Sequence, residues 1–408
     1  MLTLTYKKSK RLSNLSYAIR GPIFDKALEL ESQGHKILSL NIGNPAPFGF
    51  DAPDEIVRDM ILNIRNAQGY SHHQGIFQAR KAVMQYTQEI GIHNVAIDDI
   101  YLGNGVSELI LMSMQAILEE GDEILVPSPD YPLWTAAIKL SGGKPVHYIC
   151  DESSDWNPDL KDIRLRITPR TKGIVIINPN NPTGAVYDRD ILQKISNMAA
   201  DMGLIIFSDE IYDKILYDGN THCSIASLSD DVLVFTYGGL SKNYRAAGFR
   251  AGWLILSGPM EKAASIQEGL NLLASLRLCA NVPAQFAIQT ALGGHQSIKD
   301  LVCNDGRLCR QRDLIYQKIT QIPGITCVKP KGALYLFPKI DLRSFKWVDD
   351  EEFAFQLLED KHILIVPGSG FNHADKSHFR IVFLPREDDL REAADKMTDF
   401  FARNTKTV

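Results

Sequence analysis

Short apolar runs alternate with helical patterns along the middle of the chain. Continuous apolar runs of about four to six residues are typical of parallel strands that are covered by helices on both faces. The pattern therefore predicts an α/β fold with a mostly parallel, doubly wound sheet between about residues 98 and 256. The predicted strands are Glu123 to Val126, Pro145 to Ile149, Gly173 to Ile177, Leu204 to Phe207, Val232 to Tyr237 and Trp253 to Leu256.

One helix between these strands has clear end signals. Asp188 can cap its start, and Gly203 can end it in a left-handed turn. The chain then enters the strand at 204–207, so polar residues after that strand lie where open α/β sheets place their ligands. Apolar residues at helical spacing form the buried side of this helix: Ile191, Leu192, Ile195, Met198 and Ala199.

The pattern changes after residue 300. Two strand-like runs, 325–328 and 333–337, are separated by Pro330-Lys331-Gly332, which predicts a hairpin surrounded by helices. A long helical pattern near 297–320 is the expected connection between two domains. We expect a large domain of residues 61–299 and a smaller α+β domain made of residues 1–60 and 300–408.

Composition and charge exclude several classes of protein. The chain has 408 residues, of which 45% are hydrophobic and 23% charged, and this is typical of a globular protein with well-buried cores. Its net charge of −5 does not favour nucleic acid or anionic membranes, and the basic cluster at 7–11 is too short to change this. No signal core and no run of 18 apolar residues occur, so we expect a cytoplasmic protein. The six cysteines and ten histidines show no metal-binding spacing, so we expect no metal site.

Lys242 lies in a stretch, Ser241 to Arg250, between two apolar runs. A lysine there can form an imine with an aldehyde, while Ser241 and Arg250 can bind an anion. This combination suits pyridoxal 5′-phosphate, an aldehyde cofactor that carries a phosphate. By itself, the pattern is weak and is more typical of a solvated helix face.

Asp209 and Tyr212 follow the strand at 204–207. A carboxylate at this point can keep a pyridinium nitrogen protonated, which lets the ring accept the electrons of a broken Cα bond. The phenol of Tyr212 can form a hydrogen bond with the ring's 3-hydroxyl. Alternatively, Asp209 caps a helix that begins at Glu210.

Three further segments contain candidate ligand contacts. The amides of Asn178 to Gly184 can contact the cofactor's 3-oxygen and a substrate carboxylate, although a turn without a ligand has a similar composition. Residues 103–108 lead into a helical pattern, and the first turn of a helix favours a phosphate; an ordinary strand-to-helix turn is the alternative. Tyr131 can lie flat on the ring or belong to the core.

In this order, these segments resemble the class I and II aminotransferases, the pyridoxal-phosphate family with the aspartate-aminotransferase fold (fold type I). The resemblance covers nearly the whole chain and extends to Gly43, Tyr70 and Arg380. The strings SPDYPLWTAA, NPNNPTGAVY and KGALYLFPKI are most similar to bacterial glutamate–pyruvate (alanine) aminotransferases. The resemblance implies ping-pong transfer of an amino group between L-alanine/pyruvate and L-glutamate/2-oxoglutarate.

The resemblance also implies a role for each matched residue. Lys242 would be the Schiff-base lysine and proton shuttle, and Asp209 would pair with the ring nitrogen. The other implied contacts are Tyr212 and Asn181 with the 3-oxygen, Tyr131 with the ring face, Val106, Ser107, Ser241 and Arg250 with the phosphate, and Arg380, Asn181 and the Gly43 backbone with the substrate carboxylate.

A homodimer with shared active sites is implied as well, in which Tyr70 would reach the phosphate of the second subunit. Gly239 departs from the family, because many relatives have a serine three residues before the lysine; one side-chain phosphate contact is therefore not expected here. We expect the N-terminal arm, with Tyr17 and Arg20, to fold over the active site as a lid in which Tyr17 contacts substrate. A surface strap that only packs is the alternative.

Other activities on this fold would keep the same residues. An aromatic or broad-specificity aminotransferase, or a pyridoxal-phosphate-dependent C–S lyase, would retain Lys242, Asp209, Tyr212 and Arg380. A non-catalytic regulator would carry a DNA-binding domain ahead of the fold, and we expect none because only about 20 residues precede it. The sequence assigns no side chain to the distal carboxylate of glutamate.

Overall fold

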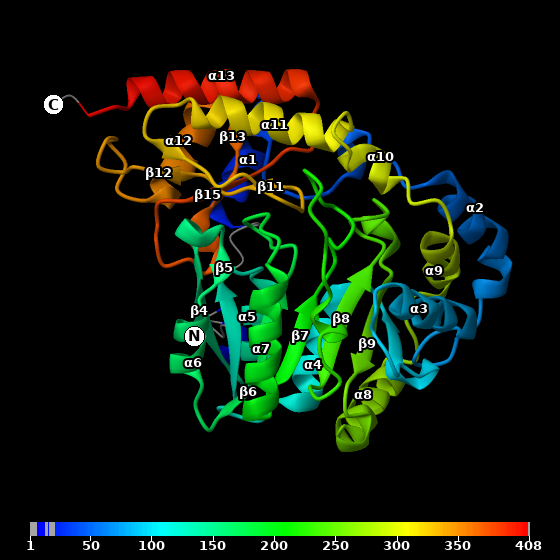
Figure 1. Ribbon diagram of the computed structural model, residues 1–408. Coiled ribbons are helices and arrows are strands. Elements are labelled where there is room, and N and C mark those ends of the chain that lie inside the picture. Colours follow the sequence, from blue (N-terminus) through cyan, green and yellow to red (C-terminus); the bar gives the residue numbers. More distant parts are fainter. Residues whose placement is uncertain (1–5, 13–14, 16–20, 407–408) are drawn as a thin grey trace, which may run out of the picture.

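A computed structural model describes residues 6–12, 15 and 21–406. Its centre is an eight-stranded sheet (Figure 1) in the order β2-β9-β8-β7-β6-β3-β4-β5. The strands of this sheet are β2 (Ile100–Gly103), β3 (Glu123–Ser128), β4 (Lys144–Asp151), β5 (Asn157–Pro158), β6 (Thr171–Ile177), β7 (Ile205–Asp209), β8 (Val234–Gly239) and β9 (Gly252–Ser257). The α-helices of the described residues are α1 (Pro22–Ser32), α2 (Asp54–Asn63), α3 (Phe77–Glu89), α4 (Val106–Ile117), α5 (Leu133–Leu140), α6 (Leu160–Arg166), α7 (Arg189–Met202), α8 (Ala264–Leu276), α9 (Val282–Gly293), α10 (Ile298–Val302), α11 (Arg307–Thr320), α12 (Asp350–Lys361) and α13 (Glu387–Arg403).

Strands β4, β3, β6, β7 and β8 are parallel neighbours, so their carboxyl ends lie at the same edge of the sheet. Strand β9 runs antiparallel to both β8 and β2, and β5 runs antiparallel to β4. Each of the six predicted strands is confirmed to within two residues at either end. The sheet is thus mostly parallel, as predicted.

Both faces of the sheet are covered by helices, because successive residues of each central strand point to opposite faces. Val175 and Phe207 share a buried cluster with residues of α4, α5 and α8. Their neighbours Ile174 and Ile206 belong to a second cluster with residues of α6 and α7. This arrangement explains why these strands contain continuous apolar runs, and it confirms the doubly wound sheet.

Helix α7 shows how the sequence sets an element's ends. Asp188 is its N-cap residue, as predicted, but the Asp188 carboxylate accepts a hydrogen bond from Asn157 Nδ2 at 3.2 Å and makes no side-chain cap bond. Gly203 ends the helix with a φ of 64°, a left-handed conformation that glycine adopts without steric cost. The chain then enters β7, which leads directly to Asp209.

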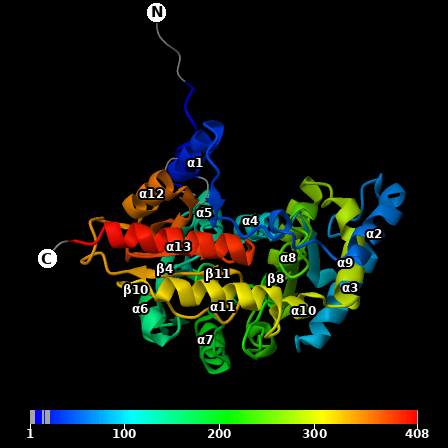
Figure 2. The ribbon, with the colours of Figure 1, turned by 90° about the horizontal axis from the view of Figure 1, so that it is seen from above.

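A second group of elements lies on the side of the sheet where the parallel strands end (Figure 1). In its core, Leu38 and Phe50 share a buried cluster with residues of α11, α12 and α13, and α11 and α13 lie side by side (Figure 2). The division at residues 61–299 stays a prediction. The strands of this group are β1 (Leu38–Ser39), β10 (Ile325–Thr326), β11 (Tyr335–Leu336), β12 (Lys339–Ile340), β13 (Ile363–Leu364), β14 (Val366–Pro367) and β15 (Phe379–Val382).

The predicted hairpin of 325–328 and 333–337 is wrong. Strand β10 pairs with β12, and β11 pairs with β15, so the two runs belong to different sheets. The turn between them bonds to a loop of the large sheet instead, because Lys331 N and Gly332 N donate to Gly184 O at 2.9 and 2.8 Å. These bonds hold β11 against the edge where β6 and β7 end.

The predicted connecting helix near 297–320 is interrupted. Helix α10 ends at Val302, and α11 begins at Arg307. A Cβ at Gly306 would collide with the backbone carbonyl of Leu301, so this close approach requires glycine. The chain therefore changes direction between the two helices.

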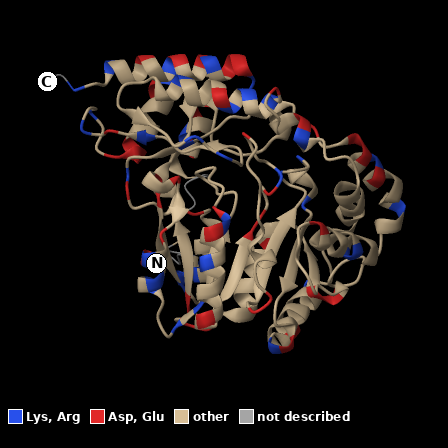
Figure 3. Cartoon of the chain, in the orientation of Figure 1, with Lys and Arg blue, Asp and Glu red and all other residues tan. Residues whose placement is uncertain are grey.

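Charges of both signs are interspersed along the outer helix α13 (Figure 3). Oppositely charged residues four positions apart stabilise a helix by about 0.2–0.5 kcal/mol per pair. The i,i+4 ion pairs of α13 are Glu387 with Arg391, Glu392 with Lys396 and Asp399 with Arg403.

Among the described helices, none is long and apolar enough to cross a membrane.

Candidate active site

A cavity of about 190 Å³ lies at the carboxyl edge of the parallel strands. Its walls come from the loops after β3, β6, β7 and β8, from the start of α4, and from the second group of elements. Most of the residues that the sequence predicted for the site are therefore brought together. Those that line the cavity are Gly43, Val106, Ser107, Tyr131, Asn181, Asp209, Tyr212, Ser241, Lys242, Arg250 and Arg380.

Among the predicted site residues that the structure describes, one lies outside this cavity. Tyr70 lies outside its lining and is 81% exposed to solvent. Tyr17 and Arg20 fall outside the described residues, so the lid stays a prediction. Gly239 is the last residue of β8, where a Cβ would approach the Ala251 carbonyl oxygen to 2.9 Å. A side chain at position 239 would therefore require the neighbouring strand to move.

Asp209 is the last residue of β7 and is only 4% exposed. Trp134 Nε1 donates a hydrogen bond to its Oδ2 at 3.2 Å, and Ile211 N donates to its Oδ1 at 3.4 Å. Both donors are neutral, and burial raises the pKa of Asp209 to about 6. A cationic group in the cavity would favour the ionised form and offset this cost. The chain forms a turn after Asp209, so the helix proposed to begin at Glu210 is not observed.

Lys242 lies in the loop between β8 and β9, half-buried, with its amine in the cavity. Its Nζ donates a hydrogen bond to Gly43 O at 2.6 Å. Removal from water lowers the pKa of Lys242, and the guanidinium groups of Arg380 and Arg250 lower it further. A lysine whose pKa is lowered has more of its amine in the unprotonated form, which is the form that attacks carbonyl groups.

One end of the cavity suits a phosphate. Gly105 precedes α4 with a φ of 82°, and a Cβ at this position would collide with the guanidinium of Arg250. Arg250 Nη2 donates to Asn104 O at 3.1 Å, which fixes the guanidinium beside the start of α4. Val106 and Ser107, the first residues of α4, line the cavity there. Backbone N–H groups at a helix start bind anions, and the guanidinium adds a full positive charge.

A different part of the cavity wall is formed by Arg380 from β15, a residue that is almost fully buried. Its Nη1 donates to Asn181 Oδ1 at 2.9 Å, and its Nη2 donates to the Asn41 carbonyl. The guanidinium carbon lies 4.4 Å from the ring centre of Tyr335 and 4.7 Å from that of Phe371. These contacts fix the plane of the guanidinium, whose fork matches a carboxylate.

Tyr335 and Trp134 were missed as site residues. Tyr335 lines the cavity, and its hydroxyl oxygen lies 2.6 Å from that of Tyr212. In the sequence Tyr335 belongs to an apolar strand-like run, where a tyrosine indicates core rather than chemistry. Trp134 lies on α5, three residues after Tyr131, and a tryptophan there also indicates core. No signal in the sequence would have assigned either hydrogen bond.

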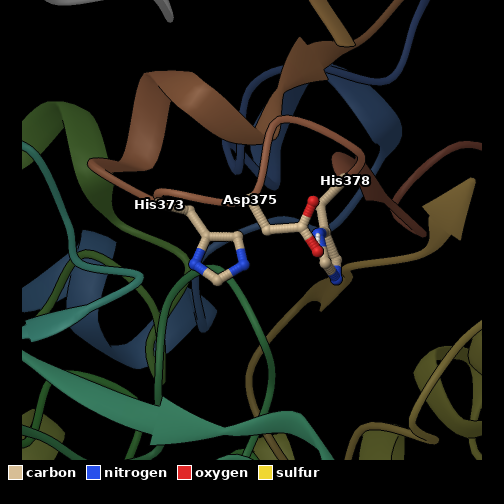
Figure 4. Close-up of side chains that lie close together, drawn as sticks. All are labelled: His373, Asp375 and His378. Carbon is tan, nitrogen blue, oxygen red and sulfur yellow. Dashed lines mark ion pairs between the residues drawn. The ribbon is translucent and has the colours of Figure 1, made fainter. Parts of the chain in front are cut away.

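His373, Asp375 and His378 lie together in the segment before β15 (Figure 4). Their possible ligand atoms are within 4.8 Å of one another. Lys339 Nζ, however, lies 2.8 Å from Asp375 Oδ2 and 3.5 Å from Glu152 Oε2. This ammonium already occupies the place beside the carboxylates that a metal cation would take, so we assign the cluster a structural role.

Comparison with known proteins agrees with the geometry of the site. The family model "Aminotransferase class I and II" matches residues 35–397. Glutamate-pyruvate aminotransferase AlaA of Escherichia coli (strain K12) is 58% identical over 396 residues, which are 97% of this chain and 98% of that protein. Alanine aminotransferase of Mycobacterium tuberculosis (strain ATCC 25618 / H37Rv) is 54% identical over 97% of this chain and 92% of its own length.

Solved structures show the same fold. An aminotransferase from Escherichia coli superimposes with a TM-score of 0.97, 57% sequence identity, and coverage of 99% of this chain and 100% of that one. Aspartate aminotransferase from Thermotoga maritima has a TM-score of 0.85 and 27% identity, and the match covers 97% of this chain and 100% of that one. The predicted aspartate-aminotransferase fold is confirmed, and the chain belongs to the class I and II aminotransferases.

Proposed function

We propose that the protein is a pyridoxal-phosphate-dependent aminotransferase that transfers an amino group between L-alanine/pyruvate and L-glutamate/2-oxoglutarate. The observation that carries this proposal is that one cavity unites the buried carboxylate of Asp209, the amine of Lys242 and the guanidinium of Arg380. The names of the relatives, glutamate–pyruvate and alanine aminotransferase, support the choice of substrates.

The side chains fit pyridoxal phosphate. Asp209 is a buried carboxylate whose two hydrogen-bond donors are neutral, so a protonated ring nitrogen would supply a charged donor in direct contact with it. When bound, the cofactor supplies an electron sink for the charge that develops at the substrate Cα. The proposed contacts are Lys242 with the aldehyde carbon, Tyr212 and Asn181 with the 3-oxygen, Tyr131 with the ring face, and Val106, Ser107, Ser241 and Arg250 with the phosphate.

Two groups of the chain would handle the substrate. Arg380 would bind the α-carboxylate with Asn181, whose Oδ1 already fixes one end of the guanidinium. Lys242 would hold and move the Cα proton, and its bond to Gly43 O keeps the amine in the cavity. Both half-reactions of a ping-pong transfer would use these same residues.

We also propose a homodimer with shared sites. Tyr70 is exposed, and His73 beside it bonds to Asn271 of α8 at 3.4 Å, which places the 70–77 segment against α8. Several large apolar side chains in α2, α8 and the residues near them are also exposed, and interfaces account for exposed apolar side chains of this size. A cytoplasmic location stays a prediction. The exposed apolar residues are Ile61, Leu62, Ile64, Phe77, Leu272, Leu276 and Leu278.

Steady-state kinetics with a panel of amino donors and 2-oxo acids test the proposed activity. Alanine and glutamate should have kcat/KM values on the order of tenfold or more above those of tyrosine and aspartate. Initial rates against both substrates should give the parallel lines of a ping-pong reaction. Highest activity with tyrosine would favour the aromatic alternative. Release of pyruvate from a C–S substrate without any 2-oxo acid would favour the lyase.

Sodium borohydride should reduce the holoenzyme's covalent link to the cofactor and fix the cofactor on Lys242. Lys242→Ala should still bind the cofactor through Asp209 and Arg250 but lose transamination, because the amine that moves the Cα proton is then absent. Peptide mass spectrometry locates the adduct. Lys214 is an internal control, since burial also lowers its pKa but it does not line the cavity. An adduct on Lys214 or any other lysine would contradict the assignment.

The raised pKa of Asp209 predicts a stability cost in the cofactor-free chain. The folded form binds this proton more tightly than the unfolded form, so stability falls as the pH rises from about 4 through about 6. Asp209→Asn should therefore stabilise the cofactor-free protein at pH 8 by roughly 2–3 kcal/mol, and this gain should shrink below pH 6. Urea unfolding at several pH values measures it.

Asp350→Asn is the matched control for this change. Asp350 is also buried, with a pKa raised to about 6 mainly by desolvation, but it does not line the cavity. Both variants should gain stability at pH 8, while only Asp209→Asn should weaken cofactor binding in an absorbance titration. Unchanged cofactor affinity in Asp209→Asn would contradict the role of Asp209.

Hybrid dimers test the shared sites. A dimer of one Lys242→Ala chain and one Tyr70→Ala chain would collect both changes in one site and leave the other intact. Such a hybrid should recover up to half of wild-type activity. A hybrid of Lys242→Ala with Phe77→Ala, which alters another exposed residue of this segment, shows the effect of the interface alone. Hybrids that form by mass yet regain no activity would rule out sharing through Tyr70.

A further inference from the structure

The hydroxyl of Tyr335 lies where three distant parts of the chain meet. Its oxygen is 2.6 Å from the hydroxyl oxygen of Tyr212, a residue in the loop after β7. The guanidinium of Arg380 lies over its ring at 4.4 Å. A Cβ at Gly43 would collide with the Tyr335 hydroxyl, so the N-terminal segment passes directly against it. Tyr335 is 2% exposed and lines the cavity.

A tyrosine that serves only the core usually gives its proton to a backbone carbonyl. Tyr217 does this in the same cluster, because its hydroxyl donates to Ala333 O at 2.9 Å. The partner of Tyr335 is instead a second hydroxyl, and both hydroxyls line the cavity. Two O–H groups share one hydrogen bond, so one proton of the pair is left for another acceptor.

The proposed contact of Tyr212 decides which proton is left. In the proposed function the Tyr212 hydroxyl donates to the 3-oxygen of the cofactor, and a phenol has only one proton to donate. Arg380 lies over the Tyr335 ring, and the rings of Tyr335 and Tyr212 meet edge to face. The 2.6 Å hydrogen bond between the two hydroxyls must therefore use the proton of Tyr335.

We propose that Tyr335 is a positioning residue, whose hydroxyl donates to the Tyr212 oxygen and directs the Tyr212 proton to the negatively charged 3-oxygen of the cofactor ring. The inference rests on the proposed function, in which Tyr212 contacts that oxygen. In a chain of hydrogen bonds each member strengthens the next, so the Tyr335 hydroxyl makes Tyr212 a stronger donor. Tyr335 thereby connects Arg380, which lies over its ring, to the hydrogen bond that Tyr212 donates to the 3-oxygen of the cofactor.

Tyr335→Phe tests this inference, because it removes the hydroxyl and keeps the ring under Arg380. The holoenzyme's visible absorption band changes with pH, and its midpoint reports the pKa of the Lys242 nitrogen bonded to the cofactor. Weaker donation to the 3-oxygen leaves that oxygen more negative, which favours the protonated form of this nitrogen. We expect the midpoint to rise by roughly half a pH unit.

A double-variant cycle separates this role from a general packing effect. Tyr212→Phe should raise the midpoint further than Tyr335→Phe does. In the Tyr212→Phe background, the added Tyr335→Phe change should have no effect, because the hydroxyl acts only through Tyr212. Equal shifts in both backgrounds, or no shift in either, would overturn the proposal.

Tyr217→Phe is the matched control. It removes another buried hydroxyl of the same cluster, outside the cavity, and should leave the midpoint unchanged. A shift in Tyr217→Phe equal to that in Tyr335→Phe would show a structural effect and overturn the proposal. Failure of the proposed function gives a different result, because the wild-type protein would then show no pH-sensitive band and no transamination.

Discussion

The burial of the Asp209 carboxylate is the constraint on which the site depends. Parallel strands carry Asp209 to the edge where β6 and β8 also end, so the loops with Asn181 and Lys242 must lie beside it. Its donors, Trp134 and the backbone of Ile211, are neutral, and the carboxyl is therefore harder to ionise than one in water. A ligand that places a positively charged donor against Asp209 is therefore bound more favourably, because both hydrogen-bond donors of this carboxyl in the free chain are neutral.

The second group of elements completes the cavity through backbone bonds. Lys331 and Gly332 bond to Gly184 at the end of the loop that holds Asn181. Strand β11 is fixed in this way, and β15 pairs with it and carries Arg380 to the Asn181 side chain. The Arg380 guanidinium and the loop that holds Asn181 are thus held by each other rather than by two independent supports.

Local patterns predicted the strands and the residues directly after them, because continuous apolar runs and the turn residues that follow them are neighbours in the sequence. Lys242 and Asp209 were found for this reason. The hairpin of 325–328 and 333–337 was predicted wrongly, and the contact of Tyr335 with Tyr212 was not predicted, since both depend on which distant segments pair. Tyr212, the hydrogen-bond partner of Tyr335, is 123 residues away in the sequence. The spacing of apolar residues within one segment does not indicate which distant segment it will contact. The role of Tyr70 depends on a second chain and remains a prediction.

The distribution of charge in the cavity favours one orientation of a bound ligand. Arg250 and the start of α4 place positive charge at one part of the wall, Arg380 places it at another beside Asn181, and Asp209 lies on the wall as a buried acid. The two positive parts of the wall are not equivalent. A helix start offers several N–H groups to a phosphate, whereas Arg380 offers a flat fork between two aromatic rings, which matches a carboxylate. A cofactor phosphate and a substrate carboxylate therefore have different best positions, and reversing them would give up favourable contacts in both places.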